Sequence, residues 1–330
     1  MILLALLPVL AALSLDGETA PRVDGDASPG DSGSEQVEQG SVYREDELEA
    51  GFLEDPGAFR KTDTSWTFAA TPFTVWLPDT DFADDPGSVS TTRGGVSLAA
   101  IRPLDEKRRL TFGLGHERSA YSFDGSDFVG VEEPFDGGSI TSASISLVTR
   151  ESETLRWSAV VSGRVGMEDG AKFGDSATWA AGGTVTFPVL DEVLLTVGGF
   201  VTTRLEDDPF FIPWVQLEWQ ITERLRLGRQ GSGVGLGYRL AEDVHTYSSF
   251  SFDVRQFRLD DDGPFPEAVV RDDELGVNLG AVWTPNPSAR IEGFVGIVRR
   301  ELTLLDGDAA LSNQLLELAP RLGLSASWRF

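Results

Sequence analysis

Two histidines, His116 and His245, are the side chains of this 330-residue chain best suited to proton transfer near neutral pH. A hydrolase needs such a base beside a nucleophile in fixed geometry. His116 is followed by Glu117, and His245 has Ser248 three residues on, a spacing that is common by chance. Thiol chemistry is excluded because the chain has no cysteine. We therefore predict no catalytic residue and no enzyme activity.

Carboxylates form the second group of side chains with chemical potential, because hard cations bind several oxygen ligands at once. They recur in short clusters between apolar segments, and none of these clusters has the alternating acids, central glycine and distal Glu of an EF-hand loop. We interpret them as solvated loops, without a metal site or a cofactor. The clusters are Asp79, Asp81, Asp84 and Asp85; Glu132, Glu133 and Asp136; Glu206, Asp207 and Asp208; Asp260, Asp261 and Asp262; and Asp272, Asp273 and Glu274.

The net charge of −26 limits the possible partners. A nucleic-acid surface needs a basic face, and an anionic membrane surface attracts basic segments, so both are disfavoured. Much of this charge lies near the N-terminus, where residues 16–58 hold 13 Asp or Glu against 2 Arg. This segment lacks apolar periodicity and is rich in Gly, Ser and Pro. We predict that residues 21–60 are a disordered acidic segment.

Residues 1–15, MILLALLPVLAALSL, are apolar and uncharged. This run is shorter than the ~20 residues of a spanning helix and suits the core of a secretory signal. We predict a signal peptide over residues 1–20; the alternative is a buried N-terminal helix. No later uncharged apolar run is long enough for a membrane helix. A chain of this kind that lies in a membrane must therefore cross it as strands.

The elements that position the remaining charged side chains are strands with one apolar and one polar face. In residues 155–165, apolar or small residues alternate with Arg156, Ser158, Ser162 and Arg164. The same alternation appears in 215–221, 234–240 and 275–283. Side chains alternate between the two faces of a strand, so each segment has one apolar and one polar wall. This pattern is typical of barrel strands.

Long acidic loops and short turns alternate along residues 61–330. Long loops are expected near 77–88, 124–138 and 260–272, and short turns near 104–107 and 151–153. The rhythm predicts an all-β fold, an antiparallel transmembrane β-barrel of about fourteen strands. The count depends on a split of residues 224–240 at 229–232 into two short strands. A different split gives twelve strands.

Charged residues on the polar face are predicted to face the barrel interior, because each would cost about 2–4 kcal/mol at mid-depth in lipid. Two interpretations stay open for them: an Arg-lined pore that favours anions, or Arg–carboxylate pairs that fill the barrel. Gly-rich inner faces slightly favour a water-filled lumen. The candidates are Arg93, Arg156, Arg164, Glu218, Arg239, Asp253, Arg255, Arg290, Glu292 and Arg321.

Aromatic residues on the apolar face gather at the strand ends next to short turns or termini. Amphipathic rings prefer the membrane–water interface, so we predict a belt there. Its members are Trp66, Trp157, Phe187, Trp219, Trp283 and Trp328. Trp214 has the opposite parity and does not fit this belt.

The last ten residues, RLGLSASWRF, alternate strictly and stop on Phe330. Together with the loop–turn rhythm and the segment 213–240, they resemble outer-membrane β-barrel proteins of diderm bacteria over about residues 64–330. The resemblance implies an outer-membrane location, contact with outer-membrane lipid, and Phe330 as a signal for the barrel assembly machinery. It implies no substrate.

The sequence therefore favours a porin-like channel for passive or selective passage of small solutes. Two alternatives remain. One is a closed structural or adhesive outer-membrane barrel that acts through its acidic loops. The other is a secreted, soluble β-sandwich that binds carbohydrate.

Overall fold

The computed structural model describes residues 65–330 except 84–85, 126–130, 132–133, 153–154, 231–232 and 308. The predicted signal peptide (1–20) and acidic segment (21–60) lie outside the described residues. No helix in the described part of the chain is long and apolar enough to cross a membrane. Its one helical element described here is the 3-10 turn η4 (Gly174–Ser176), and the rest is strand and turn.

The strands are long, and most have the period-2 alternation that the sequence shows. Their bounds are β1 (Thr67–Asp81), β2 (Ser88–Pro103), β3 (Arg108–Asp124), β4 (Gly137–Arg150), β5 (Arg156–Met167), β6 (Ala177–Leu190), β7 (Val193–Arg204), β8 (Asp207–Gln220), β9 (Leu225–Gln230), β10 (Gly233–Arg239), β11 (Val244–Arg258), β12 (Val269–Asn286), β13 (Ala289–Asp306), β14 (Ala309–Leu315) and β15 (Ala319–Arg329).

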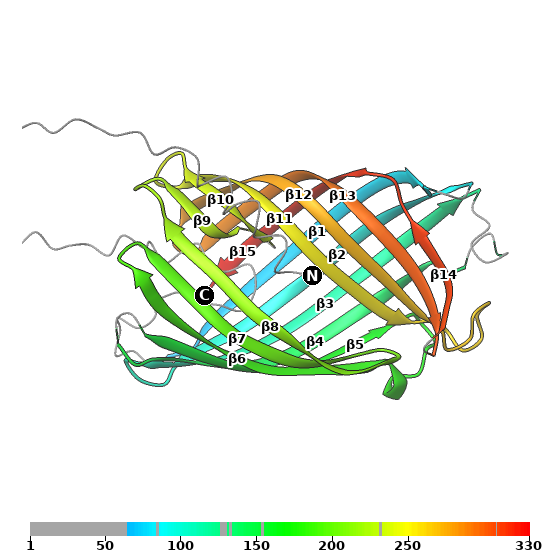
Figure 1. Cartoon of the computed structure of the whole chain (residues 1–330), viewed down its shortest axis with the longest axis horizontal. Coiled ribbons are helices and arrows are strands. Elements are labelled where there is room, and N and C mark those ends of the chain that lie inside the picture. Colours follow the sequence, from blue (N-terminus) through cyan, green and yellow to red (C-terminus); the bar gives the residue numbers. More distant parts are fainter. Residues whose placement is uncertain are drawn as a thin grey trace, which may run out of the picture. The chain divides into compact units, whose positions relative to one another are not determined.

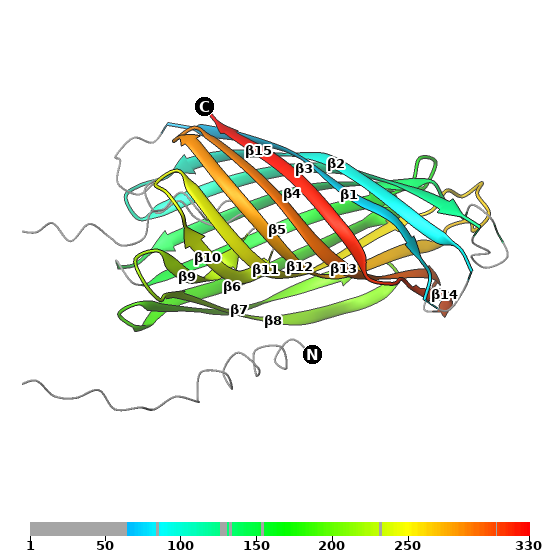
Figure 2. The same ribbon diagram turned by 90° about the horizontal axis from the view of Figure 1, so that it is seen from above.

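Consecutive strands pair antiparallel, and β15 pairs with β1, so one sheet closes on itself (Figures 1 and 2). Strands β14 and β15 both pair with β13, at 301–306 and 289–298 respectively. They are one wall strand interrupted at residues 316–318, and the barrel has fourteen strands. The prediction of an antiparallel fourteen-stranded barrel is confirmed. The twelve-strand alternative is wrong, because β9 and β10 are two separate short strands. The β-sandwich is wrong too, because all strands of the described residues belong to one sheet.

The wall has an apolar outside and a polar inside. Large apolar side chains in the middle of strands are exposed, for example Val161 (61 %), Leu279 (60 %) and Leu114 (57 %). On the opposite parity, Arg93, Asp272 and other charged residues are almost fully buried. A water-soluble fold buries its apolar residues and exposes its charged ones. Here the arrangement is reversed, as in barrels whose outer face lies in lipid.

An apolar cluster fills the interior at the end of the barrel that carries the long loops. Tyr121 of β3, Phe257 of β11 and Phe135 of a loop lie ring to ring, with centroids 5.2–5.9 Å apart. We call this the loop-end cluster; all of its members are buried to less than 7 % exposure. They are Phe82, Val89, Tyr121, Phe135, Phe257, Leu259, Ala268, Val270, Leu302, Leu304 and Leu316.

The wall is interrupted between β8 and β11, which flank the short hairpin β9–β10. Strand β8 pairs with β9 only at Trp219 and Gln220. Beyond the hairpin, β8 and β11 diverge (Figure 1), and β11 touches β5 through a parallel bridge between Arg258 and Met167. The unpaired part of β8 contains Pro209 and Pro213. Proline cannot donate a ladder hydrogen bond and is found at strand edges, so both residues suit a free edge.

Candidate functional site

The most highly charged part of the interior is a network of ion pairs below the loop-end cluster. Arg93 of β2 contacts Asp272 at 2.5 Å and Glu274 at 2.5 Å, both on β12. Arg300 of β13 contacts the same two carboxylates at 2.9 and 3.4 Å, and the Tyr121 hydroxyl donates to Asp272 at 2.8 Å. None of these five side chains is more than 6 % exposed. Buried charges occur where they are paired, as here.

Two further arginines extend this network. Arg255 of β11 pairs with Glu117 of β3 at 2.7 Å and with Asp253 at 2.7 Å, and it lies 3.6 Å from Glu274. Arg321 of β15 reaches Glu274 at 3.2 Å and donates to the Asn278 side-chain oxygen at 2.7 Å. We call these side chains the ionic layer. Its four arginines (93, 255, 300, 321) balance four carboxylates (117, 253, 272, 274), so the layer carries no net charge.

A smaller polar group lies nearer the short-turn end. Tyr247 donates to Glu292 at 2.5 Å, and Arg290 pairs with the other Glu292 oxygen at 2.9 Å. Between this group and the ionic layer lies a cavity of about 390 Å³, whose lining includes Arg255, Arg321 and Tyr247. Polar groups from seven strands therefore line one internal cavity, and its volume is in the range that small ligands occupy.

The predicted lumen-facing residues thus fall into two sets. Arg93, Asp253, Arg255 and Arg321 belong to the ionic layer, and Arg290 and Glu292 to the smaller group. The other four lie apart from both. Glu218 accepts from Gln216 at 2.9 Å, Arg239 donates to the Glu223 carbonyl at the short-turn end, and half-buried Arg156 lies opposite Arg150.

Arg164 of β5 differs from these arginines. Its guanidinium makes no hydrogen bond or ion pair with any described side chain. Asp253 and Glu117 attract it from a distance, and Arg255 repels it. It is therefore a cation without a direct partner in the described part of the chain.

One expectation about the carboxylates is wrong. Asp272, Asp273 and Glu274 were expected in a solvated loop, but they lie within β12, and Asp272 and Glu274 are 0 % and 1 % exposed. The long loop ends earlier than expected, at Ala268, because Val269 and Val270 already belong to the strand. Sequence reasoning also missed Arg300, although its even position on β13 matches Arg290 and Glu292.

The two histidines lie on different strands. His116 lies on the outer parity of β3, and its Nδ1 is 3.0 Å from the Thr141 hydroxyl. His245 is the second residue of β11 and lies opposite Arg239 and Val282. Among the described residues, no three His, Asp or Glu side chains form a group that would hold a metal ion.

The aromatic residues predicted for the belt lie at the short-turn end of the wall. Trp66, Trp283 and Trp328 are 40–48 % exposed, and Trp157, Phe187 and Trp219 are half-buried. The indole of Trp283 donates to Asp243 at 3.1 Å, which ties its polar edge to a turn. Trp214 has the inner parity of β8 and packs edge-to-face on Phe200 at 5.9 Å. Phe330 stacks on Phe68, and the two residues exchange backbone hydrogen bonds of 2.9 Å.

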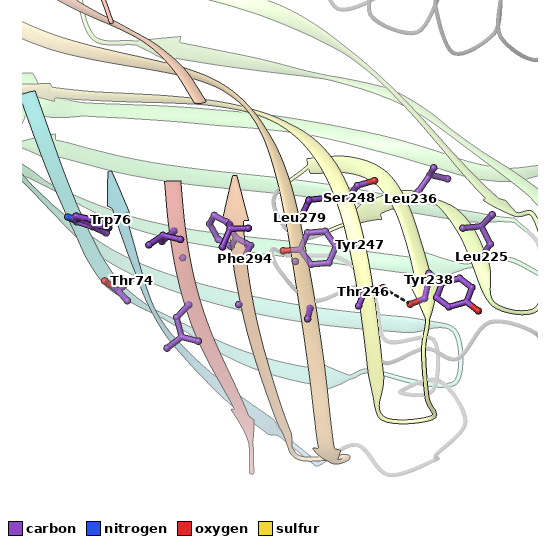
Figure 3. A pocket seen from close by; sticks show the side chains of 17 residues that line it. Thr74, Trp76, Leu225, Leu236, Tyr238, Thr246, Tyr247, Ser248, Leu279 and Phe294 are labelled. Carbon is purple, nitrogen blue, oxygen red and sulfur yellow. Dashed lines mark hydrogen bonds between the residues drawn. The ribbon is translucent and has the colours of Figure 1, made fainter. Parts of the chain in front are cut away.

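The outer wall has a shallow apolar depression of about 880 Å³ over β9–β13, β15 and β1. Figure 3 shows Trp76 at one end of it and Tyr238 and Leu225 at the other. Small residues, including Ala281 and Gly293, leave room between exposed Leu279, Val295 and Leu324. Its lining is mostly apolar, so it belongs to the outer apolar face.

No protein-family model matches the chain, and no curated protein matches it. The chain is similar in fold to solved structures at low identity. An outer membrane channel from Pseudomonas putida F1 is 12 % identical, with a TM-score of 0.47 over 84 % of this chain and 100 % of that one. The P. putida toluene transporter TodX is 10 % identical, with a TM-score of 0.42 over 83 % and 91 %. A Pseudomonas aeruginosa FadL homologue is 9 % identical, with a TM-score of 0.42 over 84 % and 94 %.

Proposed function

We propose that this chain is an outer-membrane β-barrel that passes small solutes selectively. The observation that carries the proposal is the sidedness of the closed wall: apolar side chains are exposed outside, and charged side chains are buried inside. Such a wall is stable only when lipid covers its outer face, because water would contact a continuous apolar surface far larger than a soluble protein exposes. The location also supports the proposed contacts with outer-membrane lipid and with the barrel assembly machinery through Phe330.

Selective rather than free passage is supported by what fills the interior. The loop-end cluster and the ionic layer lie in the interior and link β2 and β3 to β11, β12 and β13. The internal cavity of about 390 Å³ lies on the short-turn side of them. An open, Arg-lined pore would leave its arginines to solvent and mobile anions. Here four arginines are balanced by four carboxylates, so we propose a low conductance without a strong preference for anions.

Truncation of Phe257 to Ala is expected to raise conductance several-fold, because its ring joins Tyr121 to Phe135 across the interior. Purified protein in planar lipid bilayers provides the measurement. Phe250→Ala is the matched control: it lies on the same strand, has the outer parity and is 45 % exposed, so it should leave conductance unchanged.

A closed structural barrel is the second candidate, and the zero net charge of the ionic layer favours it. It predicts no conductance for the wild type and none for Phe257→Ala. That result would contradict solute passage and leave the structural role, provided that the protein is folded. Folding is checked by electrophoresis in the cold, where an intact barrel changes its mobility only after boiling.

A further inference from the structure

The interruption of the wall exposes part of the interior to the side of the barrel. Between the β9–β10 hairpin and the long-loop end, β8 and β11 do not pair with each other. Among the described strands, residues 207–218 of β8 pair with β7 alone. Residues 251–257 of β11 pair with β12 alone. We call this gap the side opening. Its effect is visible at Trp214, which has the inner parity of β8 and yet is 36 % exposed.

A cavity of about 330 Å³ lies at the side opening, and we call it the side pocket. It is bounded by the inner faces of β5–β8 and by the outer-parity face of β11, because the end of β11 folds in against β5. Gly166 allows this approach: a Cβ there would lie 2.1 Å from the Gln256 carbonyl oxygen. The pocket is thus formed mainly by strand placement, with Ser176 of η4 and Leu205 between β7 and β8 completing its lining.

The side pocket is amphipathic. Phe210 and Ile212 of β8 lie across from Phe252 and Val254 of β11 and form its apolar part. Phe252 is 56 % exposed, so this part borders the opening. The polar lining comes from β5, η4, β6, β7 and β11 and consists of Ser162, Arg164, Ser176, Thr178, Thr202, Thr203, Arg204 and Gln256.

Two cations and no carboxylate line this pocket. Arg204 lies over the Phe210 ring at 4.4 Å, which holds its guanidinium against the apolar part. Arg164 lies in the polar part, where it makes no hydrogen bond or ion pair with a described side chain. A guanidinium with its donors unused matches a carboxylate, which can accept two parallel hydrogen bonds.

We infer that the side pocket binds a small amphipathic anion, with its carboxylate on Arg164 and its apolar body between Phe210 and Phe252. The inference rests on the proposed function, since it names the class of solute. Access is from the side, where β8 and β11 are unpaired, and does not require the loop-end cluster to move. The aromatic lining favours an aromatic or short aliphatic body.

Isothermal titration calorimetry on the full chain in lipid nanodiscs tests the inference. The heat of probe binding to empty nanodiscs is subtracted. The probes are 4-phenylbutyrate and its neutral counterpart 4-phenylbutan-1-ol, which share one apolar body. The wild type is expected to bind the carboxylate about tenfold more tightly than the alcohol, the lower end of the gain from a charge-assisted hydrogen bond. Arg164→Gln should weaken carboxylate binding about tenfold and leave alcohol binding unchanged.

Two further variants test whether both probes bind in the side pocket. Ala180→Trp fills the pocket from β6 and should weaken both probes, whereas Arg118→Gln removes an exposed arginine elsewhere on the wall and should alter neither. Equal binding of both probes by the wild type, no binding at all, or an unchanged preference in folded Arg164→Gln would overturn the inference. Conductance is measured separately, so a pocket that binds in a barrel that does not conduct would contradict solute passage alone.

Discussion

Replacement of Asp272 by Ala is expected to lower the free energy of unfolding by about 3–5 kcal/mol, the usual cost of removing one partner from a buried ion pair. Asp272 is fully buried and binds Arg93, Arg300 and the Tyr121 hydroxyl at once. Without it, the four positive charges of the ionic layer face three carboxylates, and Arg93 and Arg300 stay buried. Urea unfolding of the protein in lipid vesicles, followed by tryptophan fluorescence, measures the change.

Asp169→Ala is the control for this prediction. Asp169 pairs with Arg118 at 3.2 Å, but the two side chains are 82 % and 64 % exposed, and exposed pairs typically contribute 1 kcal/mol or less. The comparison therefore separates burial of an ion pair from its mere presence. A variant Asp272→Ala as stable as Asp169→Ala would show that the ionic layer is hydrated and is not a structural element of the barrel.

An arginine in place of Val161 is the second large effect that we expect. Val161 lies in the middle of β5, is 61 % exposed and has the outer parity. In lipid, an arginine at mid-depth destabilises a barrel by about 2–4 kcal/mol, falling to about 0–1 kcal/mol near the interface. The same unfolding measurement on the vesicle-inserted protein provides the value.

Val189→Arg is the matched control, since Val189 is 53 % exposed and lies beside the short turn after β6. On a soluble protein both substitutions would leave the free energy of unfolding almost unchanged, because arginine is well tolerated on a surface that faces water. A larger loss of unfolding free energy in Val161→Arg than in Val189→Arg would therefore show that Val161 lies deeper in lipid than Val189. Equal stability of both variants in vesicles would reject the membrane location.

The sequence predicts the wall better than it predicts the contacts inside. Strict alternation in 155–165 and 275–283 is enough to separate outer from inner side chains, because a strand has a period of two whatever its partner. Ion pairs between inner side chains cannot be predicted in this way, because their partners come from distant strands. Arg93 and Asp272 are 179 residues apart in sequence. No local pattern indicates which of the inner carboxylates will face Arg93 after closure.

The loop-end cluster and the side opening also cannot be predicted from local sequence patterns, for two different reasons. Tyr121 and Phe257 have the inner parity that elsewhere carries polar residues, so alternation alone would misjudge that end of the barrel. The short hairpin at 224–240 was predicted, but its consequence for the neighbouring strands depends on where β11 ends, namely against β5. Pro209 and Pro213 were the available signal, because prolines in a strand indicate an edge.

The side opening also has a consequence for how molecules of this protein meet one another. A closed barrel has no free strand edges, but here β8 and β11 each keep one, and a free edge is a template on which a strand of another chain adds. Pro209 and Pro213 remove two amide donors from β8, so a strand laid along it would find an incomplete ladder. These two prolines therefore make the free edge of β8 a poor template for edge-to-edge aggregation.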